Sequence, residues 1–352
     1  MTAGTTGQGP TVLPRPAARD WLTDLKYRFP ARYVASWGAL ALLLVVAAIA
    51  APASLGGQSI KIVSALAGIL AIASMGQMLV IMLGAIDLSV SAIVAATAGV
   101  VVHYGMPGAN LWLVVPAALA TAVVISLVNG FFITVLRLNS IIVTLATYGL
   151  VTGGMLLWTG VSFSLTGEAP ASLQSVGTWT ILNVNACLII AVVVGVVLAA
   201  VLSRTRAGRQ VAQVGSNRRA ATALGVRTIS VQMSTFAAVG LLYGFAGLLL
   251  AGFIGHPDIS IGAPYQLATV TVAAIAGIAF SGGPASVASL ICASVFLQLL
   301  DQALVAIGFS SGARIVVQGF ALVLAVSAVT LGQYVLRTIG RSRRAAGARR
   351  QA

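Results

Sequence analysis

The sequence predicts an all-α membrane protein with about ten transmembrane helices and both termini in the cytoplasm. Apolar residues make up 59% of the 352 residues, and the mean hydropathy is +1.03. Only 7% of the residues are charged, against roughly 25% in soluble proteins. A soluble fold of this length could not cover its surface with polar side chains, so a soluble enzyme is excluded. In addition, the basic residues stand between long apolar runs.

Ten apolar segments approach the roughly 20 residues that a helix needs to cross the hydrocarbon core of a bilayer. The third and eighth are short, and almost no loop separates the second from the third or the eighth from the ninth. Together they predict a transmembrane domain over residues 36–336. The expected spans are 36–53, 60–83, 87–104, 111–136, 140–160, 179–202, 230–254, 265–281, 284–306 and 313–336.

The basic residues orient the chain in the membrane. Residues 1–35 are polar, and the first apolar run begins too late for a secretory signal. We therefore expect a cytoplasmic tail over 1–35 and a basic cytoplasmic tail over 337–352. Ten spans place every basic residue except Lys61 and Arg314 on one side. Because cytoplasmic loops carry the excess of Lys and Arg, both termini are assigned to the cytoplasm.

The charge, the cysteines and the histidines predict neither nucleic-acid binding nor a metal centre. The net charge of +14 is explained by the topology, and the basic residues do not line one face. Cys187 and Cys292 lie within apolar runs, so we interpret both as buried apolar residues. His103 and His256 are too few and too separated to predict a metal site.

Asp87 is an acidic residue at the expected membrane depth, where a charge costs at least about 2.5–3.5 kcal/mol. It stands in Gly84-Ala85-Ile86-Asp87-Leu88-Ser89, whose small and hydroxyl residues favour a broken helix with Gly84 as a hinge. Asp87 either caps the next helix, accepting from the amides of Ser89 and Val90, or lines the solute path together with Ser89. The two interpretations are compatible.

A second polar group lies in the expected span 284–306. Gln298, Asp301 and Gln302 fall within little more than one helical turn, so exposure to lipid is not expected. They either line a hydrophilic path or bond to neighbouring helices. Gly282 and Gly283, just before this span, are a second candidate hinge.

A third polar group begins at Asn139 and continues into the expected span 140–160. Thr144, Thr147 and Tyr148 share one helix face at spacings i, i+3 and i+4. This face either contacts a polyhydroxylated solute through neutral donors and acceptors or bonds back to its own backbone.

Residues 203–229 form the one long cytoplasmic loop, and they predict two short helices. Gly215-Ser216-Asn217 makes a turn, Ser216 or Asn217 caps the second helix, and Gly225 ends it. A short helix that exposes Ala221, Ala223 and Leu224 is suited to a groove on a partner protein. The alternative is a basic loop that only sets the topology and contacts anionic membrane lipid.

Four sequence motifs occur together in this chain and resemble those of one family. The loop pattern comprises Arg206, Gly208, Arg209, Gly215, Asn217, Ala220, Ala221 and Gly225. The others are Gly84-Ala85-Ile86-Asp87-Leu88-Ser89-Val90, Val143-Thr144-Leu145-Ala146-Thr147 and Ser281-Gly282-Gly283. In this order they resemble the membrane permeases of ribose, xylose and methyl-galactoside type ABC importers. Ala85, Ser91, Thr152 and Asp301-Gln302 mark departures from the family pattern, which we interpret as hints about the solute.

The resemblance implies a permease subunit in the bacterial cytoplasmic membrane. It implies two permease chains, either identical or related, a cytoplasmic ABC ATPase that holds ATP and Mg²⁺, and a periplasmic or lipid-anchored sugar-binding protein. The solute would be a sugar or sugar-like molecule such as a pentose, hexose or polyol. Permeases for branched-chain amino acids and nucleosides are more distant relatives and weaker alternatives for the solute.

The chain itself has no predicted ATPase site. Lys26 and Lys61 are its only lysines, and neither follows a glycine, so the Gly-Lys-Ser/Thr loop that binds phosphate is absent from the sequence. We expect no cofactor and no catalytic residue in this chain. The alternative function is an ion-coupled secondary transporter that uses Asp87 and Asp301. An intramembrane enzyme is disfavoured, because neither histidine is placed to activate Ser162.

Overall fold

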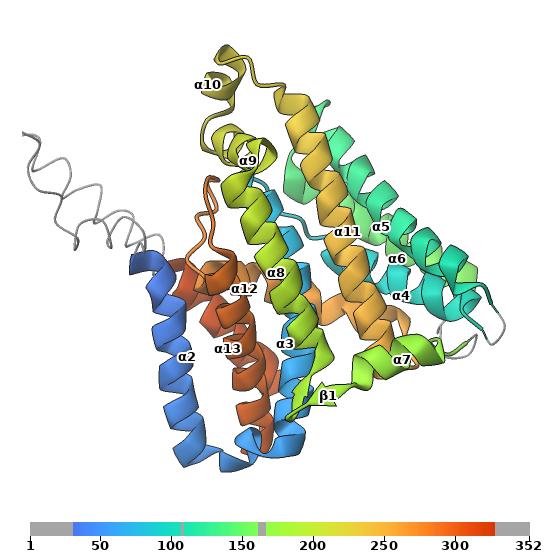
Figure 1. The fold of residues 1–352 in the computed structure, drawn as a ribbon, viewed down its shortest axis with the longest axis vertical. Coiled ribbons are helices and arrows are strands. Elements are labelled where there is room, and N and C mark those ends of the chain that lie inside the picture. Colours follow the sequence, from blue (N-terminus) through green and yellow to red (C-terminus); the bar gives the residue numbers. More distant parts are fainter. Residues whose placement is uncertain (1–30, 107–108, 161–166, 328–352) are drawn as a thin grey trace, which may run out of the picture.

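The computed structural model describes residues 31–106, 109–160 and 167–327, and these form a bundle of helices with one small hairpin (Figure 1). Most of the two expected tails, 1–35 and 337–352, lies outside the described residues. In the first half of the chain the elements are α2 (Ala31–Ala50), η1 (Pro52–Leu55), α3 (Gly57–Met82), α4 (Val90–Tyr104), α5 (Leu111–Thr134) and α6 (Ser140–Thr159).

The second half contains the hairpin and the short helices of the basic loop 203–229. The elements are α7 (Ala171–Thr178), β1 (Thr180–Ile181), β2 (Val184–Asn185), α8 (Ala186–Arg204), α9 (Arg206–Ser216), α10 (Arg218–Ala223), α11 (Thr228–Ile254), η3 (Ile259–Gly262), α12 (Ala263–Ile275) and α13 (Val287–Ala306). A last apolar helix covers Ser311–Ser327. The two strands pair antiparallel.

The helices confirm a polytopic all-α protein. Six of the described helices, α3, α5, α6, α8, α11 and α13, are long and apolar enough to cross a membrane. Shorter apolar helices over Ala35–Ala50, Val90–Tyr104, Ile259–Ile275 and Ser311–Ser327 lie where the other four spans are expected. The count of ten and the cytoplasmic termini stay predictions, because residues 1–30 and 328–352 lie outside the described part of the chain.

Several expected boundaries are wrong. The first described helix, α2, already includes Ala31, and its apolar part, Ala35–Ala50, agrees with the expected start of the first span at residue 36. The expected span 179–202 starts at Ala186, because the residues before it form the hairpin and Leu182 and Asn183 turn the chain with positive φ. Asn185 then caps α8 by accepting from the Cys187 amide at 2.8 Å.

Two breaks in the helices shorten the expected third, eighth and ninth spans. α4 begins at Val90 instead of residue 87, and α12 ends at Ile275 instead of residue 281. α13 begins at Val287, so irregular backbone covers 83–89 and 276–286. A 15-residue helix such as α4 is about 22 Å long, less than the hydrocarbon thickness. Irregular backbone at this depth is stable only where protein surrounds it.

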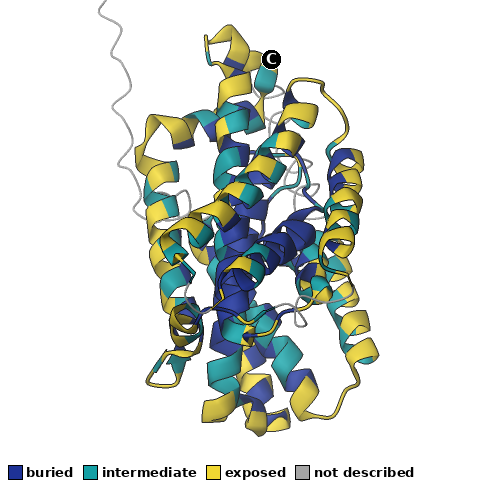
Figure 2. Ribbon diagram, turned by 90° about the vertical axis from the view of Figure 1, so that its right-hand side faces the viewer, coloured by how far each residue is buried: buried dark blue, intermediate teal, exposed yellow. Residues whose placement is uncertain are grey.

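α3 is the centre of the bundle. In its most apolar window, 94% of the residues are buried, and α8, α11, α12 and α13 pack against it. Figure 2 shows this buried core in dark blue, with exposed residues on the outer helices. Those outer helices expose large apolar side chains such as Leu150, Leu157 and Val196. Such a surface is suited to lipid or to a second membrane chain.

The basic loop lies at one end of the molecule. α9 and α10 are at the top of Figure 1, whereas α7 and the hairpin are at the opposite end. The described arginines of the 203–229 loop all lie at the α9–α10 end. This distribution agrees with the expected cytoplasmic side of that loop.

Candidate translocation site and coupling segment

The chain leaves α3 at Gly84, which adopts φ +79°. This left-handed conformation favours glycine and explains why the break begins there. A Cβ at Gly84 would lie 3.7 Å from the Ser281 carbonyl oxygen, so the break after α3 is adjacent to the break after α12. The backbone around Asp87 is therefore irregular, as the expected broken helix requires, and the role of Gly84 as a hinge stays a prediction.

Asp87 lies inside this break and is fully buried. Its Oδ1 accepts hydrogen bonds from the Ser89 amide at 2.8 Å and the Ser89 hydroxyl at 2.6 Å. The expected bond from the Ser89 amide to the Asp87 carboxylate is therefore present. The second donor is the Ser89 hydroxyl, in place of the expected Val90 amide. Within the described residues, Asp87 Oδ2 has no hydrogen-bond partner.

Polar side chains from α5 and α6 hold the break in place. Asn129 donates to the Ser89 hydroxyl at 2.8 Å and accepts from the Thr147 hydroxyl at 2.5 Å. Thr144 accepts from the Leu88 amide at 3.1 Å while donating to a carbonyl of its own helix. The expected bond back to the helix backbone is present for Thr144, whereas the bonds of Thr144 to Leu88 and of Thr147 to Asn129 were not expected. A role in the solute path stays a prediction for Thr144 and Thr147.

Gln77 and Tyr243 also hold the break, and sequence reasoning missed both. With its amide oriented to satisfy its neighbours, Gln77 donates to the Asp87 carbonyl oxygen at 2.9 Å and accepts from the Asp87 amide at 3.3 Å. The same amide donates to the Tyr243 hydroxyl at 2.9 Å. The available signal was one glutamine inside the apolar span 60–83.

Asn139 is separate from this network. Its side chain accepts from the amides of Ile141, at 2.9 Å, and Ile142, so it caps α6. It is exposed at the end of the helix. Its predicted contact with solute has no support from these bonds.

The polar residues of α13 bond to neighbouring elements. Asp301 forms a two-oxygen ion pair with Arg314, at 2.9 Å to Nε and 2.6 Å to Nη2, and accepts from Gln318 at 2.9 Å. Gln302 donates to the Ser59 hydroxyl at 3.3 Å. Of the two interpretations, bonding between helices is therefore observed for Asp301 and Gln302. Gln298 and Asp301 both line a cavity of about 340 Å³, so their place in a hydrophilic path stays a prediction.

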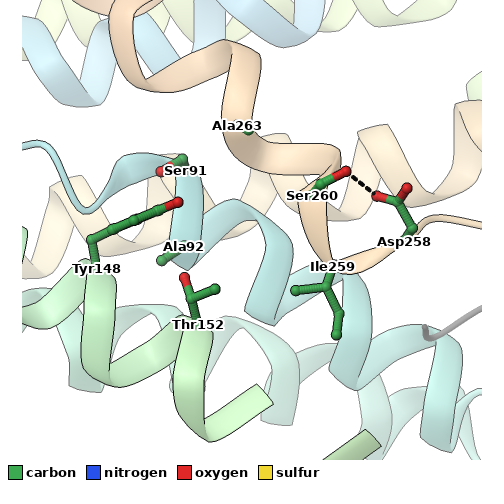
Figure 3. A pocket seen from close by; sticks show the side chains of 8 residues that line it. All are labelled: Ser91, Ala92, Tyr148, Thr152, Asp258, Ile259, Ser260 and Ala263. Atoms are coloured by element: carbon green, nitrogen blue, oxygen red, sulfur yellow. Dashed lines mark hydrogen bonds between the residues drawn. The ribbon is translucent and has the colours of Figure 1, made fainter. Parts of the chain in front are cut away.

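A smaller cavity of about 210 Å³ lies where α4, α6 and η3 meet. In Figure 3, Tyr148 and Thr152 extend from α6 toward Ser91 of α4, while Asp258 accepts a hydrogen bond from Ser260. Tyr148 therefore lines this cavity, whereas Thr144 and Thr147 bond to the break and to Asn129. The sequence placed these three residues on one face, but only Tyr148 reaches the cavity.

The basic loop 203–229 forms the two expected helices. Thr205 caps α9 by accepting from the Gly208 amide at 3.2 Å. Asn217, one of the two expected caps, accepts from the Ala220 amide at 3.0 Å at the start of α10. Gly225, at φ +80°, follows its end.

α9 ends in close contact with both helix breaks. A Cβ at Gly215 would collide with the carbonyl group of Met82, the last residue of α3. A Cβ at Gly282 would collide with the carbonyl oxygen of Gly215. The Gly283 amide donates to the Met82 carbonyl oxygen at 3.0 Å. Three segments that are distant in sequence therefore meet at one point through their backbones.

The expected exposure of Ala221 is wrong. Ala221 is only 2% exposed, because it lies on the face of α10 that turns toward the rest of the protein. Ala220, Thr222, Ala223 and Leu224 are exposed. Arg218 reaches back to the Thr134 carbonyl oxygen at 3.4 Å, whereas Arg206, Arg209 and Arg219 are exposed.

The profile of the family described as "branched-chain amino acid transport system / permease component" matches residues 59–326. The chain belongs to this permease family. It is 32% identical to the autoinducer 2 import system permease protein LsrC of Enterobacter sp. (strain 638), over 72% of this chain and 74% of the relative. It is 30% identical to the LsrC protein of Salmonella paratyphi B, over 76% and 78%. No solved structure matches the chain.

The family membership confirms the main expectation from the sequence motifs. The chain is a permease subunit of an ABC importer of the ribose type, and it is a transport subunit, not an enzyme. Such a permease works with an ATPase and a solute-binding protein. Its apolar helices place it in the bacterial cytoplasmic membrane as a multi-pass protein.

Proposed function

We propose that the permease carries a sugar or sugar-like solute into the cell, and that a partner ATPase drives it by pushing on the coupling segment, residues 206–225. ATP and Mg²⁺ are held by that partner. The observation that carries the proposal is the backbone contact of Gly215 with Met82 and Gly282. Because this contact leaves no space between the segments, a displacement of α9 must move the ends of both helix breaks.

The mechanism follows from the connections of the break. The segment after Met82 leads through Gly84 to Asp87, and hydrogen bonds connect Asp87 and Ser89 to α5 and α6. A push on α9 is therefore passed to α4, α5 and α6 as packed elements. A second permease chain completes the path, and the solute-binding protein delivers the solute at the opposite end, near α7.

The solute class rests on the relatives. The most similar relatives named above are permeases for autoinducer 2, whereas the family description names branched-chain amino acids. We favour a neutral polyhydroxylated solute, such as a pentose, hexose or polyol.

The coupling role is tested by Gly215→Ala in the importer reconstituted with its ATPase and binding protein. We expect membrane insertion and ATPase binding to persist and solute uptake to fall at least about tenfold, because the added methyl group separates α9 from Met82. Uptake is measured with autoinducer 2, D-ribose and L-leucine as probes.

Gly38→Ala is the matched control, because a Cβ at Gly38 meets no atom within 4 Å. Equal uptake by the two variants would refute the coupling role. Uptake by the unaltered protein that continues without ATP and stops with an uncoupler would replace the importer with the ion-coupled transporter.

A further inference from the structure

The cavity between α4, α6 and η3 contains hydroxyl groups without partners. Ser91 is 2% exposed and lines the cavity, and its Oγ has no hydrogen-bond partner among the described residues. A buried hydroxyl without a partner costs roughly 1–3 kcal/mol, so such an atom requires an explanation. A ligand that bonds to it supplies one.

Thr152 differs from most threonines in the described helices. Thr97, Thr121, Thr159 and Thr269 each donate to the carbonyl oxygen four residues earlier. No such bond is made by Thr152, whose side chain instead extends into the cavity in Figure 3. Its hydroxyl is therefore available to a ligand, as a donor and as an acceptor.

The position of the cavity connects it to the helix break. Ser91 lies two residues after Ser89, which bonds to Asp87. A Cβ at Gly262 would collide with the Ser91 carbonyl group, so η3 is packed directly on the first turn of α4. Any movement of the break therefore changes the walls of this cavity.

The charges of the lining select among solutes. None of the eight described residues that line the cavity is basic, and Asp258 is the acidic one. Asp258 can pair with the ammonium group of an amino acid, but none of these lining residues offers a cationic partner for its carboxylate, whose desolvation would therefore be unfavourable. A neutral solute with several hydroxyl groups matches the hydroxyls of Ser91, Tyr148 and Thr152 and the carboxylate of Asp258.

We propose that this cavity is a solute subsite of the permease, in which Ser91, Tyr148, Thr152 and Asp258 bind a neutral polyhydroxylated solute and discriminate against amino acids. The proposal rests on the transport function proposed above and assigns its selectivity to these side chains. The binding protein selects the solute first, and the subsite then selects at the membrane.

The first test measures protection of a cysteine in Thr152→Cys. Both native cysteines are buried, so the unaltered chain provides a low background. The purified permease is labelled with methyl methanethiosulfonate alone, or with D-ribose, D-galactose, xylitol or L-leucine present. We expect at least one of the polyhydroxylated probes to slow labelling about threefold or more, while L-leucine has no effect.

Ser175→Cys, on the exposed surface of α7, is the matched control, because it lies outside the cavity. Its labelling should be the same with every probe. Protection of Thr152→Cys by none of the polyhydroxylated probes, or by L-leucine equally, overturns the subsite. This assay does not need the ATPase, so its failure is distinct from a failure of Gly215→Ala.

The second test uses Thr152→Val in the reconstituted importer, with the probe that protects best. We expect the amount of solute carried per ATP to fall about three- to tenfold, because the variant loses about one neutral hydrogen bond to the solute. The rate of ATP hydrolysis should stay within about twofold of that of the unaltered importer, because the lost bond acts on the solute alone. Loss of uptake and hydrolysis together in Thr152→Val would indicate a merely structural role and overturn the assignment of Thr152.

Discussion

At the scale of single residues, Asn129 of α5 connects three helices through hydrogen bonds, to Ser89 just before α4 and to Thr147 of α6. It is fully buried, and its amide uses a donor toward Ser89 and its acceptor toward Thr147. A buried polar network stabilises a structure only if each member has its partners, because an unpaired group keeps its desolvation cost. Asn129 therefore holds the break before α4 against α6.

Replacing Asn129 with Ala should lower the free energy of unfolding by about 1–3 kcal/mol, because the Thr147 hydroxyl loses its acceptor in a buried site. The measurement is thermal or denaturant unfolding of the purified permease in detergent. Thr121→Ala on the same helix is the control, since its hydroxyl bonds only to the local Ala117 carbonyl. Equal destabilisation by the two variants would contradict the network.

At the scale of elements, an ion pair holds the last described helix to α13. Asp301 and Arg314 meet with both carboxylate oxygens engaged, and their side chains are 19% and 29% exposed. A two-oxygen pair between guanidinium and carboxylate fixes the orientation as well as the distance. The sequence indicated that Asp301 avoids lipid, but its partner stands in another helix.

Asp301→Ala and Arg314→Ala should each lower the free energy of unfolding by about 1–3 kcal/mol, because each leaves one partly buried charge without its partner. The double variant should cost less than the sum of the two single variants. Unfolding of the four proteins in one detergent measures this coupling. Additive effects would show that the pair contributes nothing to holding the two helices together.

At the scale of the whole molecule, the basic coupling segment and the hairpin lie at opposite ends (Figure 1). This arrangement predicts opposite sides of the membrane for two strongly exposed leucines. Leu224 follows α10 and is 79% exposed, and Leu182 in the hairpin is 93% exposed. They form a matched pair for a topology experiment.

In spheroplasts without the partner ATPase, a membrane-impermeant thiol reagent should label Leu182→Cys and leave Leu224→Cys unlabelled. After permeabilisation, both should react, since the positive-inside rule places the arginine-rich loop in the cytoplasm. The native cysteines are buried and contribute little. Labelling of Leu224→Cys in sealed spheroplasts would reverse the assigned orientation.

The sequence by itself determined the membrane class, the approximate positions of the helices, the break at Gly84 and the two helices of the coupling segment. These features depend on local signals: long apolar runs, glycine at a positive φ, and capping residues such as Asn217. The same local reasoning failed where the chain turns back on itself, as in the hairpin before α8, which shortens the expected span 179–202.

Only the tertiary structure decided which distant residues meet. Gly215 contacts Met82 and Gly282, Asp301 pairs with Arg314, and Ala221 is buried although its neighbours are exposed. Tyr148 separates from Thr144 and joins Ser91 at the cavity. In each case the partner of a side chain depends on how whole helices pack. Side chains on one helical face meet different neighbours at different positions along the helix. The sequence pattern of one helix indicates that a face is polar, and the packing of the neighbouring helices determines which groups that face binds.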